Sequence, residues 1–264
     1  MNAAPMNATA ARLTALGRAE LTLLGRNRNT LFVALLMPVL MIFLLRSSLT
    51  GLSGGPGGAE RLPMGIAAAT LVGGTGMILM LVVYMSLVST YVARREELVL
   101  KRLRTGEARD PEILAGGALP AVVIALVQCA VLSALGPAVL DVAAPRRPDL
   151  LVLGVLGAVP LLAALAALTT VITRTVESAG LTTLPFFLLS ATGSGLMVPA
   201  DSLPDPVAAV CSLLPLSGAM ELVRAGWLGG GDGKELLGAA LTTVAWIVIS
   251  VFAVRKWFRW EPRR

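Results

Sequence analysis

The sequence of 264 residues contains no histidine and only two cysteines, Cys129 and Cys211. Without these residue types the chain cannot build a Cys/His zinc site or an imidazole-based catalytic centre, and we expect no metal site. Charged residues are also scarce, at 14%, whereas an ordinary soluble domain carries about 25%. With a mean hydropathy of +0.80, this composition excludes a soluble globular protein.

Long apolar segments make up most of the chain. A helix needs roughly 20 apolar residues to cross a bilayer, and we predict six such spans, at residues 29–49, 63–92, 111–140, 150–173, 179–198 and 236–254. Gly73, Gly74 and Gly76 would let a neighbouring helix approach the second span closely. Pro185 and the sequence Gly193-Ser194-Gly195 are expected to interrupt the fifth. The predicted fold is therefore an all-α integral membrane protein.

The distribution of positive charge predicts how the chain is oriented. Basic residues are retained on the cytoplasmic side of a membrane, and 16 of the 22 Lys and Arg residues share one side if the N-terminus is inside. Both termini of this multi-pass protein are therefore expected in the cytoplasm. The basic residues are dispersed between apolar runs and form no nucleic-acid-binding face. Usage rich in Ala, Gly and Arg favours a bacterial protein of the cytoplasmic (inner, plasma) membrane.

Three segments outside the spans have structure of their own. Residues 8–28 alternate Leu and Ala with Arg and Glu, which predicts an amphipathic helix at the membrane interface or, alternatively, a solvated tail. Residues 94–110 predict a short charged helix ended by Gly106, after which Asp110 caps the next span; the alternative is a solvated loop that only sets topology. Residues 201–228 are too rich in proline for a span, and predict two short helices or a loop with two surface turns.

Two of these segments resemble one protein family. The run Arg95-Glu96-Glu97 leading to Leu100-Lys101-Arg102-Leu103-Arg104-Thr105-Gly106 is similar to the stretch after the second span in ABC type-2 exporter permeases. A second similarity lies in the proline-rich turn from Val198 to Pro204, followed by Leu213-Leu214-Pro215-Leu216-Ser217-Gly218. With six spans and an N-terminal amphipathic helix, the resemblance covers nearly all of residues 1–264, as a single transmembrane domain.

The resemblance implies an ATP-driven pore built from two permease subunits, either two copies of this chain or one copy and a related chain. A separate ATP-binding subunit would hold ATP and Mg²⁺, since Gly233-Lys234-Glu235 is no Walker A loop and this chain is expected to be no enzyme. The inner helix at 94–110 would couple to that subunit through Glu96, Glu97, Arg102, Arg104, Thr105 and Gly106. Residues 201–228 would form an outer re-entrant helical pair, with Pro204, Pro215, Glu221 and Arg224 as its marked positions.

Polar residues within the spans are candidates for a substrate path. They are Gln128, Thr169, Thr170, Thr182, Thr183, Ser190 and Thr192, and hydrogen bonding between helices is the alternative role for each. A path so poor in charge favours an amphipathic or hydrophobic cargo such as a drug, antibiotic, lipid or lipidated peptide, which makes antibiotic efflux a hypothesis. The competing functions are a membrane anchor or assembly factor that transports nothing and, with less support because histidine is missing, a membrane-embedded enzyme.

Overall fold

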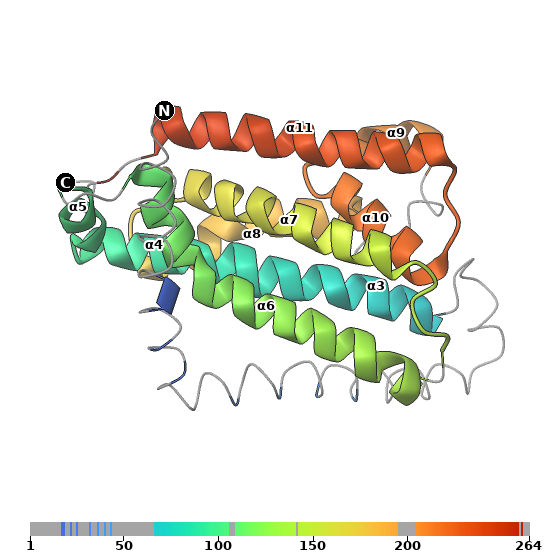
Figure 1. Ribbon diagram of the computed structural model, residues 1–264. Coiled ribbons are helices and arrows are strands. Elements are labelled where there is room, and N and C mark those ends of the chain that lie inside the picture. The colour runs from blue at the N-terminus through green and yellow to red at the C-terminus, as the bar shows by residue number, and fades with distance from the viewer. Residues whose placement is uncertain are drawn as a thin grey trace, which may run out of the picture.

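The computed structural model describes residues 66–105, 109–140, 142–194, 204–258 and 260, together with eight isolated positions before residue 44. Every regular element in these ranges is helical. The long helices lie side by side along one axis and form an elongated bundle (Figure 1). Helix α5 and the last turns of α11 lie at one end, termed the α5 end, and the opposite end is termed the α9 end.

The first long rod of the bundle consists of three consecutive elements, α3 (Ile66–Ile78), η1 (Leu79–Met85) and α4 (Ser86–Glu96). The middle element is a π-helix, whose hydrogen bonds join residues five apart and widen the turn. Gly73, Gly74 and Gly76 are all buried, and α3 packs against α6 and α10. The three small residues are buried in a helix that packs against two others, and their role in close approach stays a prediction.

The remaining elements follow in chain order. They are α5 (Val99–Arg104), α6 (Asp110–Leu140), α7 (Pro148–Thr169), α8 (Val176–Gly193), α9 (Asp205–Ser212), α10 (Ser217–Leu228) and α11 (Gly233–Trp257). Local signals set several of these boundaries. A capping box of Thr175 and Ser178 starts α8, and one of Asp232 and Glu235 starts α11.

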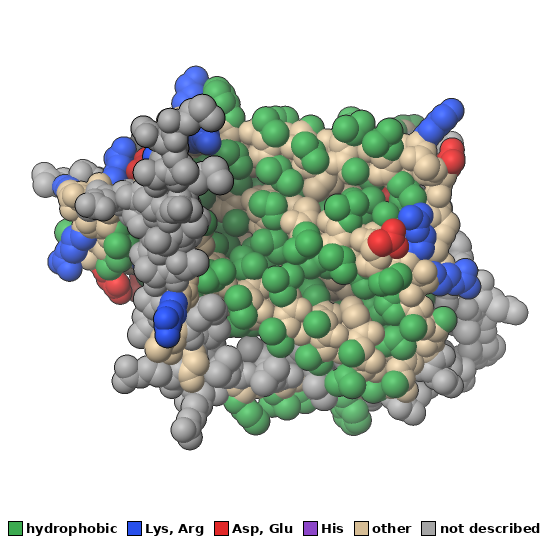
Figure 2. Space-filling model, in the orientation of Figure 1, with side chains coloured by type: hydrophobic (Ala, Val, Ile, Leu, Met, Phe, Trp, Pro, Cys, Tyr) green, Lys and Arg blue, Asp and Glu red, His purple; other side chains and the backbone are tan. Residues whose placement is uncertain are grey.

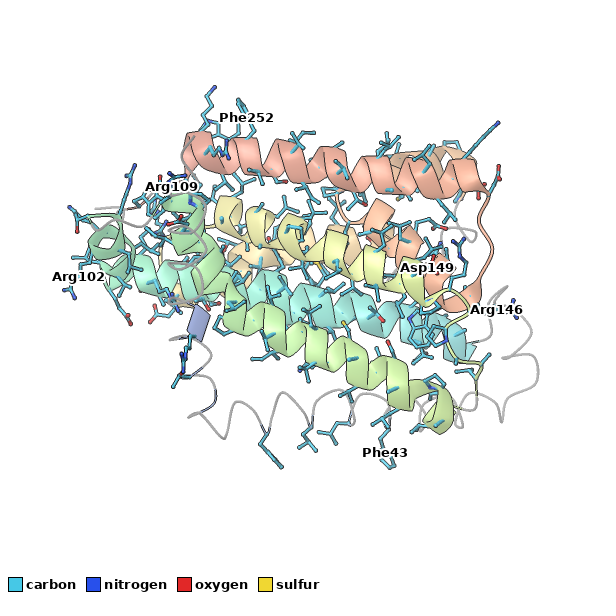
Figure 3. The ribbon with its side chains drawn as sticks, in the orientation of Figure 1. Phe43, Arg102, Arg109, Arg146, Asp149 and Phe252 are labelled. Atoms are coloured by element: carbon cyan, nitrogen blue, oxygen red, sulfur yellow. The ribbon has the colours of Figure 1, made fainter. Side chains whose placement is uncertain are left out.

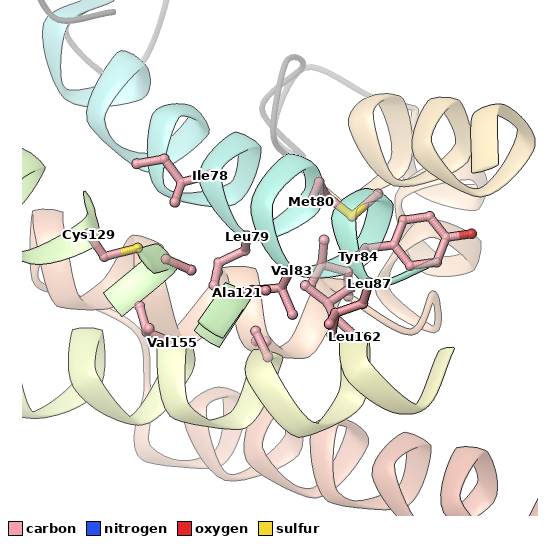
Figure 4. Packing of buried hydrophobic residues seen from close by; sticks show 14 of the residues in the cluster. Ile78, Leu79, Met80, Val83, Tyr84, Leu87, Ala121, Cys129, Val155 and Leu162 are labelled. Atoms are coloured by element: carbon pink, nitrogen blue, oxygen red, sulfur yellow. The ribbon is translucent and has the colours of Figure 1, made fainter. Parts of the chain in front are cut away.

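The apolar core surrounds η1. Leu79, Val83, Tyr84 and Leu87 are completely buried and, with Leu162 of α7, belong to one continuous cluster (Figure 4). The ring of Tyr84 packs against Phe186 of α8 with their centroids 4.9 Å apart, so this one turn joins two neighbouring helices. The π-helix therefore lies at the centre of the packing.

Glycine permits backbone contact between α7 and α10, which share the most extensive helix contact of the described residues. A Cβ added at Gly226 would lie 2.5 Å from the backbone nitrogen of Leu151, and one added at Gly154 would lie 2.8 Å from the carbonyl oxygen of Ala219. Arg147 N donates a hydrogen bond to the Gly226 carbonyl oxygen at 3.0 Å. Both glycines are required by this close approach.

Four helices of the described residues are long and apolar enough to span a membrane: Ala68–Glu96, Asp110–Leu140, Pro148–Thr169 and Gly233–Trp257. They correspond to the predicted second, third, fourth and sixth spans. The predicted first span and the 8–28 helix lie outside the described residues, except for isolated positions. Of the first span, Phe32, Leu36, Leu40 and Phe43 are helical and exposed, as expected for one face of an apolar helix.

The predicted fifth span corresponds in part to α8. The prediction that Pro185 interrupts it is wrong, because α8 continues through Pro185 and ends at Gly193. Proline removes a single backbone donor, and the surrounding turns of a packed helix tolerate that loss. Residues 195–198 lie outside the described ranges, and α8 as described is not among the four span candidates.

Candidate functional site

The junction between α4 and α5 is a sharp, well-bonded turn. Leu98 adopts the left-handed conformation, with φ 59°, which non-glycine residues adopt only where the surroundings enforce it. Leu98 N donates to the carbonyl oxygen of Arg95 at 3.1 Å, and Arg102 N donates to that of Leu98 at 3.0 Å. Leu100 is 1% exposed and anchors α5 against the bundle. The turn therefore fixes the direction in which α5 leaves α4.

Arg95, in the last turn of α4, joins the α4–α5 junction to the end of α7. Its side chain is 1% exposed. Nη1 donates to the carbonyl oxygen of Thr170 at 2.7 Å, and Nη2 donates to that of Thr173 at 2.6 Å. Thr170 is the C-cap of α7, where an α-helix leaves acceptors unpaired and carries partial negative charge, and Thr173 lies in the turn that leads to α8. A buried charge thus ties α4 to the α7–α8 turn.

A second set of contacts joins α5 to α6 and to the C-terminal segment. Arg104 Nε forms an ion pair with Asp110 Oδ1 at 3.2 Å, and the Arg104 guanidinium lies 5.0 Å from the centre of the Trp260 ring. Glu112 Oε2 accepts a hydrogen bond from Arg109 N at 3.0 Å, which caps the start of α6. Three segments therefore meet at Arg104.

The other predicted coupling residues are exposed wherever the structure describes them. Glu96, Glu97, Arg102 and Thr105 are exposed, and the Thr105 hydroxyl donates to the Arg102 carbonyl oxygen at 2.8 Å. Gly106 lies outside the described residues. Figure 3 shows Arg102 and Arg109 at the α5 end, far from Arg146 and Asp149 at the α9 end. The exposed side chains of Glu96 and Glu97 at the end of α4 and of Arg102 on α5 form one charged surface, termed the charged surface of α5.

The predicted outer pair corresponds to α9 and α10, which meet at a bend of 98°. Pro204 directly precedes α9, and Pro215 is buried in the turn between the two helices. Glu221 and Arg224 of α10 form an ion pair at 3.1 Å. A bend of this size at membrane depth is typical of a broken span or a re-entrant loop.

The comparison with protein families identifies the type of protein. The ABC-2 type transporter family matches the chain over residues 11–228. This chain belongs to the ABC-2 type transporter family. No curated protein sequence matches it. Membership implies a lipid bilayer and an ATP-binding cassette partner for this ABC-2 membrane domain, and such domains are generally not catalytic.

The predicted path residues of the ABC-2 chain do not converge on one place. Gln128 lies on α6, and Thr169 and Thr170 lie at the end of α7. The other four lie on α8, whose main neighbours are α4, η1 and α9. Thr183 and Ser190 are buried, and Thr192 is exposed. Most of these hydroxyls bond the backbone one turn back, as Thr183 Oγ1 does to the Ala179 carbonyl oxygen at 2.9 Å. Their role in a substrate path stays a prediction.

Two polar links of the ABC-2 domain join helices, the alternative role given for Thr169 and a role not predicted for Arg95. The Tyr84 hydroxyl and Thr169 Oγ1 share a hydrogen bond of 2.9 Å, and Arg95 caps α7 as described above. A basic residue at the end of an apolar run indicates a membrane boundary, but nothing local indicates a partner 75 residues away. In the described ranges, no group of three or more Cys, Asp or Glu residues could hold a metal ion.

Proposed function

We propose that the chain is the permease subunit of an ATP-driven exporter in a bacterial cytoplasmic membrane, with six spans and both termini in the cytoplasm. A separate ATP-binding subunit would bind ATP and Mg²⁺, and a second copy or a related permease would complete the pathway. The observation that carries the proposal is the charged surface of α5, which is exposed to a partner while Arg95 ties its base to α7.

The charge of the two ends supports the proposed orientation. In Figure 2 apolar side chains cover the middle of the visible face, and charged side chains gather at its two ends. The α5 end carries most of the described basic residues, namely Arg94, Arg95, Lys101, Arg102, Arg104, Arg109, Arg174, Arg255 and Lys256, whereas the α9 end carries Arg146, Arg147, Arg224 and Lys234. Because basic residues remain in the cytoplasm, the α5 end is the proposed inner end.

The α4–α5 junction supports a coupling mechanism. A force applied to α5 would reach α4 through the backbone hydrogen bonds of the Leu98 turn, and would reach the end of α7 through the short, buried hydrogen bonds of Arg95. ATP binding in the partner would then shift the population between inward-open and outward-open states by binding one of them better. Residues Glu96, Glu97 and Arg102 are the proposed contacts with that partner.

The cargo is proposed to be an amphipathic or hydrophobic molecule, such as a drug, antibiotic, lipid or lipidated peptide. Support comes from the scarcity of charge between the two ends, since polar groups in the spans are mostly hydroxyls that bond their own helix. A strongly hydrated solute would find few partners along such a route. Antibiotic efflux is one form that this export would take.

The test begins with the tagged chain purified in mild detergent from its native membrane. We expect an ATP-binding subunit to be recovered with it in a fixed ratio. Arg102→Glu should weaken that association about tenfold, the scale of reversing one exposed interfacial charge. Lys234→Glu makes the same change at an exposed position of the α9 end and should have no effect.

Two results would contradict the proposal. Recovery of a well-folded chain without an ATPase would favour the membrane-anchor alternative. Equal loss of the partner with Arg102→Glu and Lys234→Glu would show that α5 is not the contact surface.

A further inference from the structure

A cavity of about 620 Å³ lies at the α9 end, among α8, α9, α10 and the first turns of α11. Small-molecule sites typically measure about 300–1,000 Å³. Among the described residues, three charged side chains line this cavity, Glu221 and Arg224 from α10 and Glu235 from α11. A cavity of this size with a few polar groups in its lining is a candidate ligand site.

The charges of the cavity do not balance. The Arg224 side chain is only 11% exposed, and its Nη1 donates to Glu221 Oε2 at 3.1 Å. Glu235 Oε2 accepts a hydrogen bond from Asp232 N at 3.1 Å, which involves no cation. Among the described side chains of the lining, two carboxylates face one guanidinium, so the formal charges of these side chains sum to −1. Such a site attracts a cation.

The rest of the lining is small or apolar. Leu213 and Leu228 contribute apolar surface, while Ser217 and Thr242 contribute hydroxyls. Gly238 also lines the cavity, and a Cβ added there would meet no atom within 4 Å. The α11 wall is therefore recessed, which leaves room for a bulky group beside the carboxylates.

We propose that this cavity binds an organic cation with an apolar body. The positive charge would lie beside Glu221 and Glu235, and the apolar body would lie against Leu213 and Leu228. Arg224 would hold Glu221 in place rather than bind the ligand. Binding of this ligand does not depend on the proposed function. A role of the cavity in export rests on the proposed function.

Two ions of nearly equal size and opposite charge provide a direct test, tetraphenylphosphonium and tetraphenylborate. The purified full-length chain, without an ATPase, is assayed by equilibrium binding of each radiolabelled ion in detergent. We expect saturable binding of tetraphenylphosphonium at least about tenfold tighter than that of tetraphenylborate, as a net unit charge near the ligand provides. Equal binding of both ions would overturn the proposal.

A charge-changing variant tests the same point from the protein side. The double substitution Glu221→Gln with Glu235→Gln changes the formal charge of the cavity from −1 to +1. Glutamine at 235 can still cap α11, and thermal unfolding checks that the variant is folded. The preference between the two ions should reverse. An unchanged preference for tetraphenylphosphonium would show that it binds elsewhere.

The shape of the cavity is tested by filling it. Gly238→Leu places a side chain in the recess and should lower the affinity for tetraphenylphosphonium at least about tenfold, since the two would compete for volume. Gly233→Leu is the matched control, because Gly233 also has open space around its Cβ position, lies on the same helix and does not line the cavity. Equal effects of both substitutions would overturn the assignment.

Failure of this proposal and failure of the proposed function are distinguishable. Selective binding to a chain that recruits no ATPase would retain the site and remove the exporter. Recovery of an ATPase together with non-selective binding would retain the exporter and remove the site.

Discussion

At the scale of single residues, Arg95 shows why a membrane protein buries a charge. A guanidinium is planar and carries five N–H donors, so it can serve several carbonyls at once. Here one short bond reaches Thr170, the C-cap at the negative end of the α7 helix dipole, and another reaches Thr173 in the turn before α8. The charge is stabilised by a carbonyl that α7 leaves unpaired and by a carbonyl of that turn, so one side chain joins the ends of α4 and α7.

The choice of arginine at this position is testable. Arg95→Lys keeps the charge but replaces the fork with a single ammonium group, so we expect a loss of about 1–3 kcal/mol in the free energy of unfolding. Thermal unfolding of the detergent-solubilised variant would show a lower Tm. Arg255→Lys, the same change at an exposed position of α11, should leave Tm nearly unchanged. Equal behaviour of the two variants would contradict the bonding role of Arg95.

At the scale of helices, the packing depends on where side chains are missing. α10 approaches α7 so closely that Gly226 faces the backbone of Leu151. No rotamer change relieves an overlap with backbone atoms, so a helix must move. The backbones of α7 and α10 are thus in direct contact at this interface, termed the α7–α10 seam.

A pair of glycine substitutions tests this seam. Gly226→Ala should destabilise the protein by about 1–3 kcal/mol through overpacking, measured as a lower Tm. Gly238→Ala on α11 meets open space and should be neutral or stabilise by up to about 1 kcal/mol, because alanine favours a helix over glycine. Destabilisation by both would indicate that helix propensity or membrane insertion, not the seam, decides the result.

At the scale of the whole molecule, the bundle has two chemically different ends. The α5 end is strongly basic and has an exposed helix, whereas the α9 end has the bent pair α9 and α10 with a charged cavity. An apolar middle separates them (Figure 2). This difference between the two ends suits a protein that responds to one side of a membrane and acts at the other.

The orientation of the ends can be measured directly. In a background with Cys129→Ala and Cys211→Ala, single cysteines replace Arg102 or Lys234, both exposed. A membrane-impermeant maleimide added to intact cells should label the cysteine at 234, and should label the one at 102 only after permeabilisation. The reverse pattern would invert the proposed topology.

Sequence reasoning predicted the parts of this structure that local chemistry determines. Pro111 lies in the first turn of α6 as expected, and α9 and α10 lie within the predicted proline-rich segment. The predicted cap at Asp110 is wrong by one residue, because Asp110 is already helical and pairs with Arg104, while Glu112 bonds the backbone of Arg109. The partner of Arg95, the left-handed turn at Leu98 and the cavity depend on atoms brought together from distant parts of the chain. Periodicity and capping contain no information on such contacts, so only the structure reveals them.

The π-helix has a consequence for the numbering of the second span. Each residue of an α-helix turns the chain by about 100° and advances it by about 1.5 Å, and the wider turn of η1 accommodates extra chain length before α4 begins. Deleting one residue between 79 and 85 would let η1 close to α-helical geometry and leave Arg95 facing the end of α7, whereas deleting one residue between 86 and 94 would rotate the end of α4 by about that angle and point Arg95 away from α7. Many side chains of the span can therefore be replaced by others of similar volume. The number of α-helical residues before Arg95, by contrast, determines the direction in which Arg95 points.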